Sequence, residues 1–103
     1  MSDSRFVPEL DTAALRREKD RARALRATGW WKRRIAEGVC HYCRTRVGAR
    51  GLTADHVVPL IRGGRSVRGN MVPSCKECNN RKRSLLPWEW EDYLRRLGAA
   101  SEE

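Results

Sequence analysis

The first regular pattern along the chain is a run of good helix formers with few apolar positions. Residues 11–27, DTAALRREKDRARALRA, are dominated by Ala, Leu, Arg, Glu and Lys, which favour helix in water. Leu15, Ala22 and Leu25 form a thin apolar stripe, and charged side chains cover the other faces. The stripe predicts weak docking and nothing stronger. Two interpretations stay open, a solvated helix and a basic helix that lies on DNA phosphates or against a partner.

A second, shorter helix is predicted after Gly29, which interrupts the first one. The segment WWKRRIAEG places Trp31 and Ile35 four residues apart, on one inward face. Trp30 and Trp31 could also stack on nucleic-acid bases, but large aromatic side chains contribute most to packed cores. We therefore expect core packing here.

The last predicted helix begins at Pro87, because proline suits the first helical position. Its apolar residues recur at the spacing of one inward helix face and are Trp90, Tyr93, Leu94 and Leu97. Gly98 is expected to end this helix, with AASEE as a tail.

Between the helices the pattern changes to short extended segments. GLTADHVVPLI predicts a strand that Pro59 interrupts and that the turn at Gly63-Gly64 closes. After Asn70, the segment MVPSCKECNNRKRSLL is expected to enter a helix near Cys75. The middle of the chain therefore reads as a short, irregular hairpin followed by a helix.

The charge balance of the chain indicates what kind of partner it binds. The 103 residues carry a formal net charge of +9, with a pI of about 10.3, which favours a polyanion as partner. A membrane surface would attract the same charge. However, the chain has no long apolar run, and MSDSRFVPEL lacks the apolar stretch of a signal peptide. We expect a soluble protein of the cytoplasm that binds nucleic acid and no membrane.

The cysteines form two pairs, each with two residues between its members. They are Cys40, Cys43, Cys75 and Cys78. Two disulfides, unrelated thiols or a redox pair would also fit four cysteines, but paired knuckles without a signal peptide favour a structural zinc site. Because 34% of the residues are charged, we expect zinc to decide whether residues 38–86 fold. His41, between two ligands, is expected on the surface.

Asp55 and His56 stand side by side in the predicted strand. Asp55 and Asn79 would offer a carboxylate and an amide oxygen, which suit a hard cation such as Mg2+. Lys82 and Arg83 follow Asn79 by three and four residues, on the same helix face. An imidazole at His56 could deprotonate water for attack on a phosphodiester. For both neighbours to serve one centre, regular strand geometry should fail at or just after them.

The segments CHYC, ADHVVPLIRGG and GNMVPSCKECNNRK resemble the HNH endonuclease family over about residues 38–85. The resemblance implies that His56 is the general base and that Asp55 and Asn79 hold the catalytic metal. It also implies that Asn70 braces the hairpin loop and orients the histidine by hydrogen bonding. Asp and Asn in the first and last signature positions favour Mg2+ or Mn2+ over a second zinc.

The same resemblance implies the fold class: α+β, with a small ββα-metal unit, a four-cysteine zinc site, N-terminal helices and a C-terminal helix. We expect a basic helical extension over residues 1–28, a nuclease domain over residues 29–98 and a tail over residues 99–103. The expected activity is that of a metal-dependent DNA endonuclease or nickase.

Cationic side chains near the hairpin and the following helix are expected to contact DNA: Lys82, Arg83, Arg62 and Arg65. Two alternatives to the enzyme are a non-catalytic zinc-ribbon DNA-binding module and an accessory subunit of a larger DNA-processing machine, for example in packaging. The module explains the charge and the zinc equally well. It gives no reason for the pattern of Asp55, His56 and Asn79.

Overall fold

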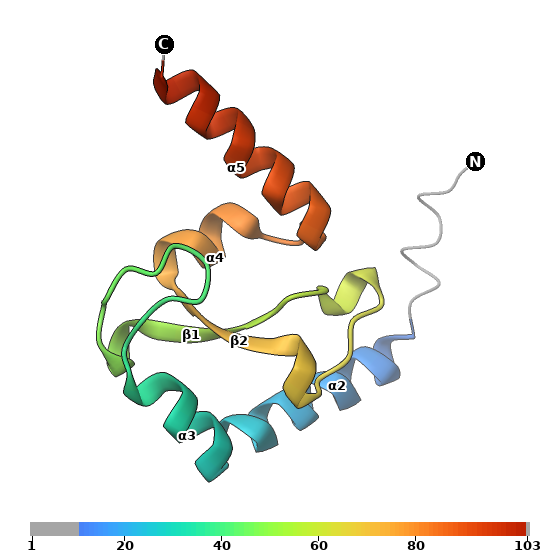
Figure 1. Cartoon of the computed structure of the whole chain (residues 1–103). Helices are drawn as coiled ribbons and strands as arrows, with labels where there is room; N and C mark the ends of the chain where they lie inside the picture. Colours follow the sequence, from blue (N-terminus) through green and yellow to red (C-terminus); the bar gives the residue numbers. More distant parts are fainter. Residues whose placement is uncertain (1–10, 103) are drawn as a thin grey trace, which may run out of the picture.

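The computed structural model describes residues 11–102, and in this part of the chain helices lie on both sides of a two-stranded hairpin (Figure 1). The elements are, in chain order, α2 (Thr12–Arg26), α3 (Gly29–Ala36), β1 (Leu52–His56), β2 (Met71–Cys75), α4 (Lys76–Lys82) and α5 (Pro87–Glu102). Single turns of 3-10 helix occupy Ala49–Gly51, Leu60–Arg62 and Arg68–Asn70. The expected α+β class with a ββα unit is confirmed. The first ten residues of the expected extension and the last residue of the tail lie outside the described part.

The two N-terminal helices form one side of the molecule. Asp11 caps the start of α2 and Thr28 caps the start of α3, because each side chain accepts a hydrogen bond from a backbone N–H of the first turn. Ala22 of α2 and Trp31 of α3 are buried together with Met71 of β2. The predicted inward position of Trp31 is confirmed, and α2 packs on the rest of the fold.

The hairpin sets which residues share a face. β1 pairs antiparallel with β2, so that Asp55 lies opposite Val72 and His56 lies opposite Met71. Consecutive strand residues point to opposite faces. Asp55 therefore faces α4, and His56 lies on the face that α2 and α3 cover, the lower side of the hairpin in Figure 1.

A second core lies on the other side of the hairpin. Its buried members are Cys40, Cys75, Cys78 and Trp90, with Tyr93 packed against them. The rings of Trp90 and Tyr93 are stacked, with centroids 5.5 Å apart. The start of α5 is thereby fixed to the cysteine cluster.

The rest of α5 differs from the expectation. The helix continues past Gly98 to Glu102, because one glycine among good helix formers costs only about 1 kcal/mol. Leu94 is 41% exposed and Leu97 is also exposed, since the helix extends away from the hairpin beyond its first turns (Figure 1). Within residues 11–102, no helix has the length and apolar character needed to cross a bilayer.

Candidate functional site

The four cysteines meet at one point, as their spacing predicts. Their sulfur atoms all lie within 4.8 Å of one another. Sγ of Cys40 accepts the backbone N–H groups of Tyr42 and Cys43 at 3.3 and 3.5 Å, and Sγ of Cys75 accepts that of Cys78 at 3.4 Å. Thiolates are the sulfur species that bind metal. The cluster can therefore hold a tetrahedral metal ion such as zinc.

The protonation of these thiols follows from their surroundings. Burial raises the pKa of Cys40, but the backbone N–H groups around its sulfur outweigh burial and lower the pKa to about 6. Burial raises the pKa of Cys75 and of Cys78. The Cys40 thiol is thus deprotonated more readily than those of Cys75 and Cys78.

Asp55 lies on the α4 side of β1, and only 7% of it is exposed. Its Oδ2 accepts a hydrogen bond from the Tyr42 hydroxyl at 2.6 Å and pairs with Nζ of Lys82 at 3.1 Å. Burial, followed by the Asp55 carboxylate, raises the pKa of Tyr42. Tyr42 therefore stays protonated and donates a hydrogen bond to Asp55.

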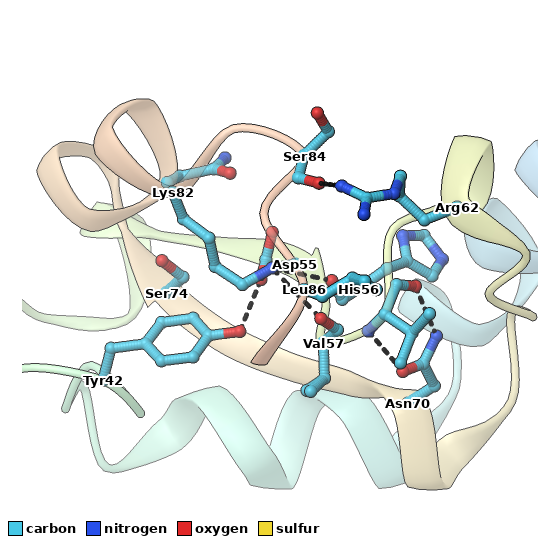
Figure 2. A network of polar contacts seen from close by, with 12 residues as sticks. Tyr42, Asp55, His56, Val57, Arg62, Asn70, Ser74, Lys82, Ser84 and Leu86 are labelled. Carbon is cyan, nitrogen blue, oxygen red and sulfur yellow. Dashed lines mark hydrogen bonds and ion pairs between the residues drawn. The ribbon is translucent and has the colours of Figure 1, made fainter. Parts of the chain in front are cut away.

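Lys82 differs from its expected place. It is fully buried, and Figure 2 shows its side chain reaching from α4 to Asp55. Its ammonium also donates to the backbone carbonyls of His56 and Val57, at 3.1 and 3.2 Å. The sequence placed Lys82 beside Asn79 on an outward face. The structure corrects this, because a buried carboxylate needs a cation as partner.

His56 does not share the surroundings of Asp55. β1 ends directly after His56, as expected, but both residues still lie within the strand and therefore on opposite faces. Nε2 of His56 lies 2.9 Å from Oγ of Ser66. Burial lowers the pKa of His56 below its ordinary value of 6.5, so its neutral form predominates at neutral pH.

Asn70 holds the loop that follows β1 (Figure 2). Its Oδ1 accepts the backbone N–H of Val58 at 2.8 Å, and its Nδ2 donates to the carbonyls of Val58 and Arg65 at 3.0 and 2.9 Å. A side chain at Gly64 would collide with the Val58 carbonyl, which explains that glycine. The expected bracing role matches these contacts. In the described chain, however, the ring of His56 is bonded to Ser66 and not to Asn70.

Asn79 lies one turn before Lys82 on the same side of α4. Its Nδ2 donates to Oγ1 of Thr53 at 3.1 Å. The Thr53 hydroxyl already donates to the carbonyl of Ser74 at 3.1 Å, so it can only accept from Asn79. The amide oxygen of Asn79 is thus left as an acceptor.

The donor set fits a hard divalent cation. No hydrogen bond from residues 11–102 goes to Oδ1 of Asp55 or to Oδ1 of Asn79. Carboxylate and amide oxygens are what Mg2+ and Mn2+ prefer, and Mg2+ takes only one or two protein groups. Thr53 and Asp55, two residues apart on one face of β1, bring α4 residues Asn79 and Lys82 to the same face of the hairpin.

The arginines expected at DNA have different surroundings. Arg62 pairs with both carboxylate oxygens of Glu89, at 3.1 and 3.2 Å, and so ties the loop to α5. Arg65 binds Glu18 through Nε at 3.0 Å, yet most of its side chain is exposed. Arg83 is exposed just after α4, where its φ is +50°. Of the four side chains expected to contact DNA, those of Arg83 and Arg65 are therefore the more accessible to a phosphate.

Three residues of this region were missed by sequence reasoning: Tyr42, Ser66 and Glu18. Knuckle geometry predicted that the residues between Cys40 and Cys43 point outward; His41 is exposed, but Tyr42 turns inward. Glu18 lies in the same stripe as Leu15, Ala22 and Leu25, at helical spacing. The signal available in the sequence for Glu18 was an acidic residue among the apolar positions of a helix stripe. Nothing in the sequence marked Ser66.

A comparison with protein-family models agrees with the sequence resemblance. The sequence model of a family described as HNH endonuclease matches residues 40–92. This range includes all four cysteines, the hairpin and α4. The comparison with curated proteins yields no match.

Proposed function

Because the chain belongs to the HNH endonuclease family, we propose that it is a metal-dependent DNA endonuclease that nicks one strand at a time. The observation that supports this most is that β1 and α4 bring Oδ1 of Asp55 and Oδ1 of Asn79, to which no hydrogen bond from residues 11–102 goes, to one face of the hairpin. The next residue of β1, His56, offers a half-buried imidazole whose pKa is lowered by burial. A zinc-ribbon module that only binds DNA would need neither.

We propose that Asp55 and Asn79 hold Mg2+ or Mn2+ through their Oδ1 atoms. When bound, this cation would neutralise the charge that develops on the phosphate and on the leaving 3′ oxygen. Lys82 and Tyr42 keep Oδ2 of Asp55 in place. The role proposed for Lys82 is therefore to position Asp55, and not to contact the scissile phosphate.

His56 is the proposed general base. It takes a proton from water as the water oxygen bonds to phosphorus and the bond from phosphorus to the 3′ oxygen breaks. The leaving 3′ oxygen takes a proton from solvent water, so the products are a 5′ phosphate and a 3′ hydroxyl. The lowered pKa leaves the ring able to accept this proton at neutral pH. Asn70, by bracing the loop after β1, fixes the position of His56 indirectly.

DNA is the proposed substrate and partner. Beyond the family, the support is the net charge of +9 and the exposed side chains of Arg65 and Arg83. Arg62, engaged with Glu89, would reach a phosphate only by giving up that pair. Contacts from Arg to phosphates position DNA without reading its sequence. We therefore propose weak sequence specificity and an affinity that falls steeply with salt.

The test uses zinc-loaded protein, supercoiled plasmid, and Mg2+, Mn2+ or no divalent cation. We expect nicking that depends on the cation and that His56→Ala loses by a factor of about 100 or more. His41→Ala is the matched control, because it removes the other histidine, which is exposed at the cysteine knuckle; it should nick as the wild type does.

Equal nicking by the wild type and His56→Ala would reject His56 as the base. DNA binding without cleavage under any divalent cation would favour the zinc-ribbon module or an accessory subunit of a DNA-processing complex.

A further inference from the structure

A chain of hydrogen bonds joins helix α2 to the ring of His56. We propose that α2, which precedes the part of the chain matched by the family, belongs to the catalytic centre: through Ser66 it fixes the tautomer of His56 and leaves Nδ1 as the basic nitrogen. This inference rests on the proposed function, because it assigns positioning residues to the proposed general base. Ser66 and Glu18 are those positioning residues.

The direction of the hydrogen bonds follows from donor counting. The Ser66 hydroxyl has a single proton, and it donates that proton to the backbone carbonyl of Glu18 at 2.6 Å. A carbonyl can only accept. Oγ of Ser66 must therefore accept from Nε2 of His56, 2.9 Å away, so Nε2 carries the hydrogen. In the neutral ring, Nδ1 then holds the lone pair.

Ser66 itself is held firmly by the same helical turn. Oε1 of Glu18 accepts the backbone N–H of Ser66 at 2.7 Å, and Oε2 accepts from Nε of Arg65 at 3.0 Å. Ser66 is 4% exposed and Glu18 is 9% exposed. Two bonds from one helical residue thus fix both the backbone and the hydroxyl of Ser66.

This arrangement gives a reason for a buried acid on a basic helix. Moving a carboxylate out of water is unfavourable unless it is paired and hydrogen-bonded. A helix that served only as a DNA-binding appendage would have no need to bury Glu18 against the loop between β1 and β2. The contact instead ends at His56, one residue from the proposed metal ligand Asp55. Residues beyond the family match therefore complete the surroundings of the base.

The experiment measures the tautomer directly. The zinc-loaded full chain is labelled with 15N in its histidines, and two-bond proton–nitrogen correlations of the rings are recorded at about pH 8, where the rings are neutral. His41→Ala assigns the two sets of signals. In the wild type, we expect Nε2 of His56 to have the shift of a protonated nitrogen and Nδ1 that of a lone-pair nitrogen.

Ser66→Ala removes the acceptor. We expect the two nitrogen signals to move toward the average of both tautomers, and nicking at saturating DNA to slow about tenfold, the rate equivalent of one lost hydrogen bond. The DNA concentration for half-maximal rate should not change. Ser84→Ala is the matched control, since the Ser84 hydroxyl takes no part in this chain of bonds. Zinc content and circular dichroism check that each variant folds.

Glu18→Ala is a second variant, which keeps the Ser66 hydroxyl but releases the Ser66 backbone. It should move the His56 signals in the same direction by a smaller amount. A wild-type His56 protonated at Nδ1, or ring signals that stay unchanged in folded Ser66→Ala, would overturn the inference. If the wild type did not nick DNA with any divalent cation, the proposed function would be overturned instead. The ring signals would still test the tautomer of His56, so that failure of the inference and failure of the proposed function can be told apart.

Discussion

Each face of β1 carries an ionisable side chain that is partly or almost fully withdrawn from water, and the two side chains have different partners. On the α4 face, Asp55 is matched by a full charge, the buried ammonium of Lys82, and by the Tyr42 hydroxyl. On the α2 face, Nε2 of His56 lies 2.9 Å from an uncharged hydroxyl, that of Ser66. Burial lowers the pKa of His56, whereas Asp55 has a cation and a hydroxyl as direct partners.

This comparison explains how the adjacent residues Asp55 and His56 can have different chemical roles. A cation beside His56 would repel a second proton, whereas an anion beside it would stabilise the charged ring. A hydroxyl does neither and fixes only the direction of the hydrogen bond. Asp55, in contrast, is almost fully buried, and burying a carboxylate is unfavourable unless it is paired and hydrogen-bonded. The two side chains lie in different environments although they are adjacent, because consecutive residues of a strand point to opposite faces.

The largest effect is expected from a change that unfolds the hairpin and so disrupts the contacts on both faces of β1. Cys75→Ala removes one of the four clustered thiols, an expected zinc ligand, at the end of β2, where the hairpin meets α4. Structural zinc supplies about 10–16 kcal/mol of apparent binding free energy, against a typical net stability of about 5–15 kcal/mol. We expect loss of bound zinc and of the helical circular-dichroism signal.

Lys76→Ala, an exposed change next to Cys75 on α4, is the control and should keep both zinc and fold. If Cys75→Ala were folded, free of zinc and active, the structural-zinc assignment would be wrong.

A smaller effect breaks the α4 face alone. Lys82→Met leaves Asp55 buried without its cation, which should lower the free energy of unfolding by about 3–5 kcal/mol. The double variant Asp55→Asn with Lys82→Met removes both charges and should recover most of this loss. Urea unfolding of zinc-loaded protein measures each value, and Lys76→Met on the exposed side of α4 is the control. If Lys82→Met cost no more than Lys76→Met, the ion pair would have no structural role.

The smallest effect tests the α2 face through pH. The backbone N–H of Ser66 is the main cause that lowers the pKa of Glu18 below its ordinary value of 4.5. Because the folded pKa is the lower one, this stabilisation is present above pH 4.5 and is lost as pH falls through the folded value. Glu18→Gln should lack that part of the acid dependence.

The measurement is the difference in unfolding free energy between wild type and Glu18→Gln, followed from about pH 6 to about pH 3. Loss of zinc in acid affects both proteins and cancels in the difference. A difference that does not shrink as pH falls would contradict the contact between Glu18 and Ser66.

Much of the fold could be predicted because it rests on local rules. Helix formers and the spacing of Trp31 and Ile35 gave the N-terminal helices, and the cysteine spacing gave the cluster. The end of α5 was predicted wrongly, since Gly98 alone is too weak a signal to stop a helix. The inward stripe failed at Leu94 for a tertiary reason, because this side chain stays 41% exposed where α5 extends away from the hairpin (Figure 1).

By itself, the sequence determined which side chains this protein has for chemistry: four thiols at ligand spacing, a carboxylate beside an imidazole, two asparagines and a large excess of cations. Only the tertiary structure decided their partners. It buried Lys82 against Asp55, turned Tyr42 inward and placed Ser66 between Glu18 and His56. The physical reason is that residue spacing fixes the face of a helix or strand, whereas the partner of a buried polar group depends on which distant segment packs against that face.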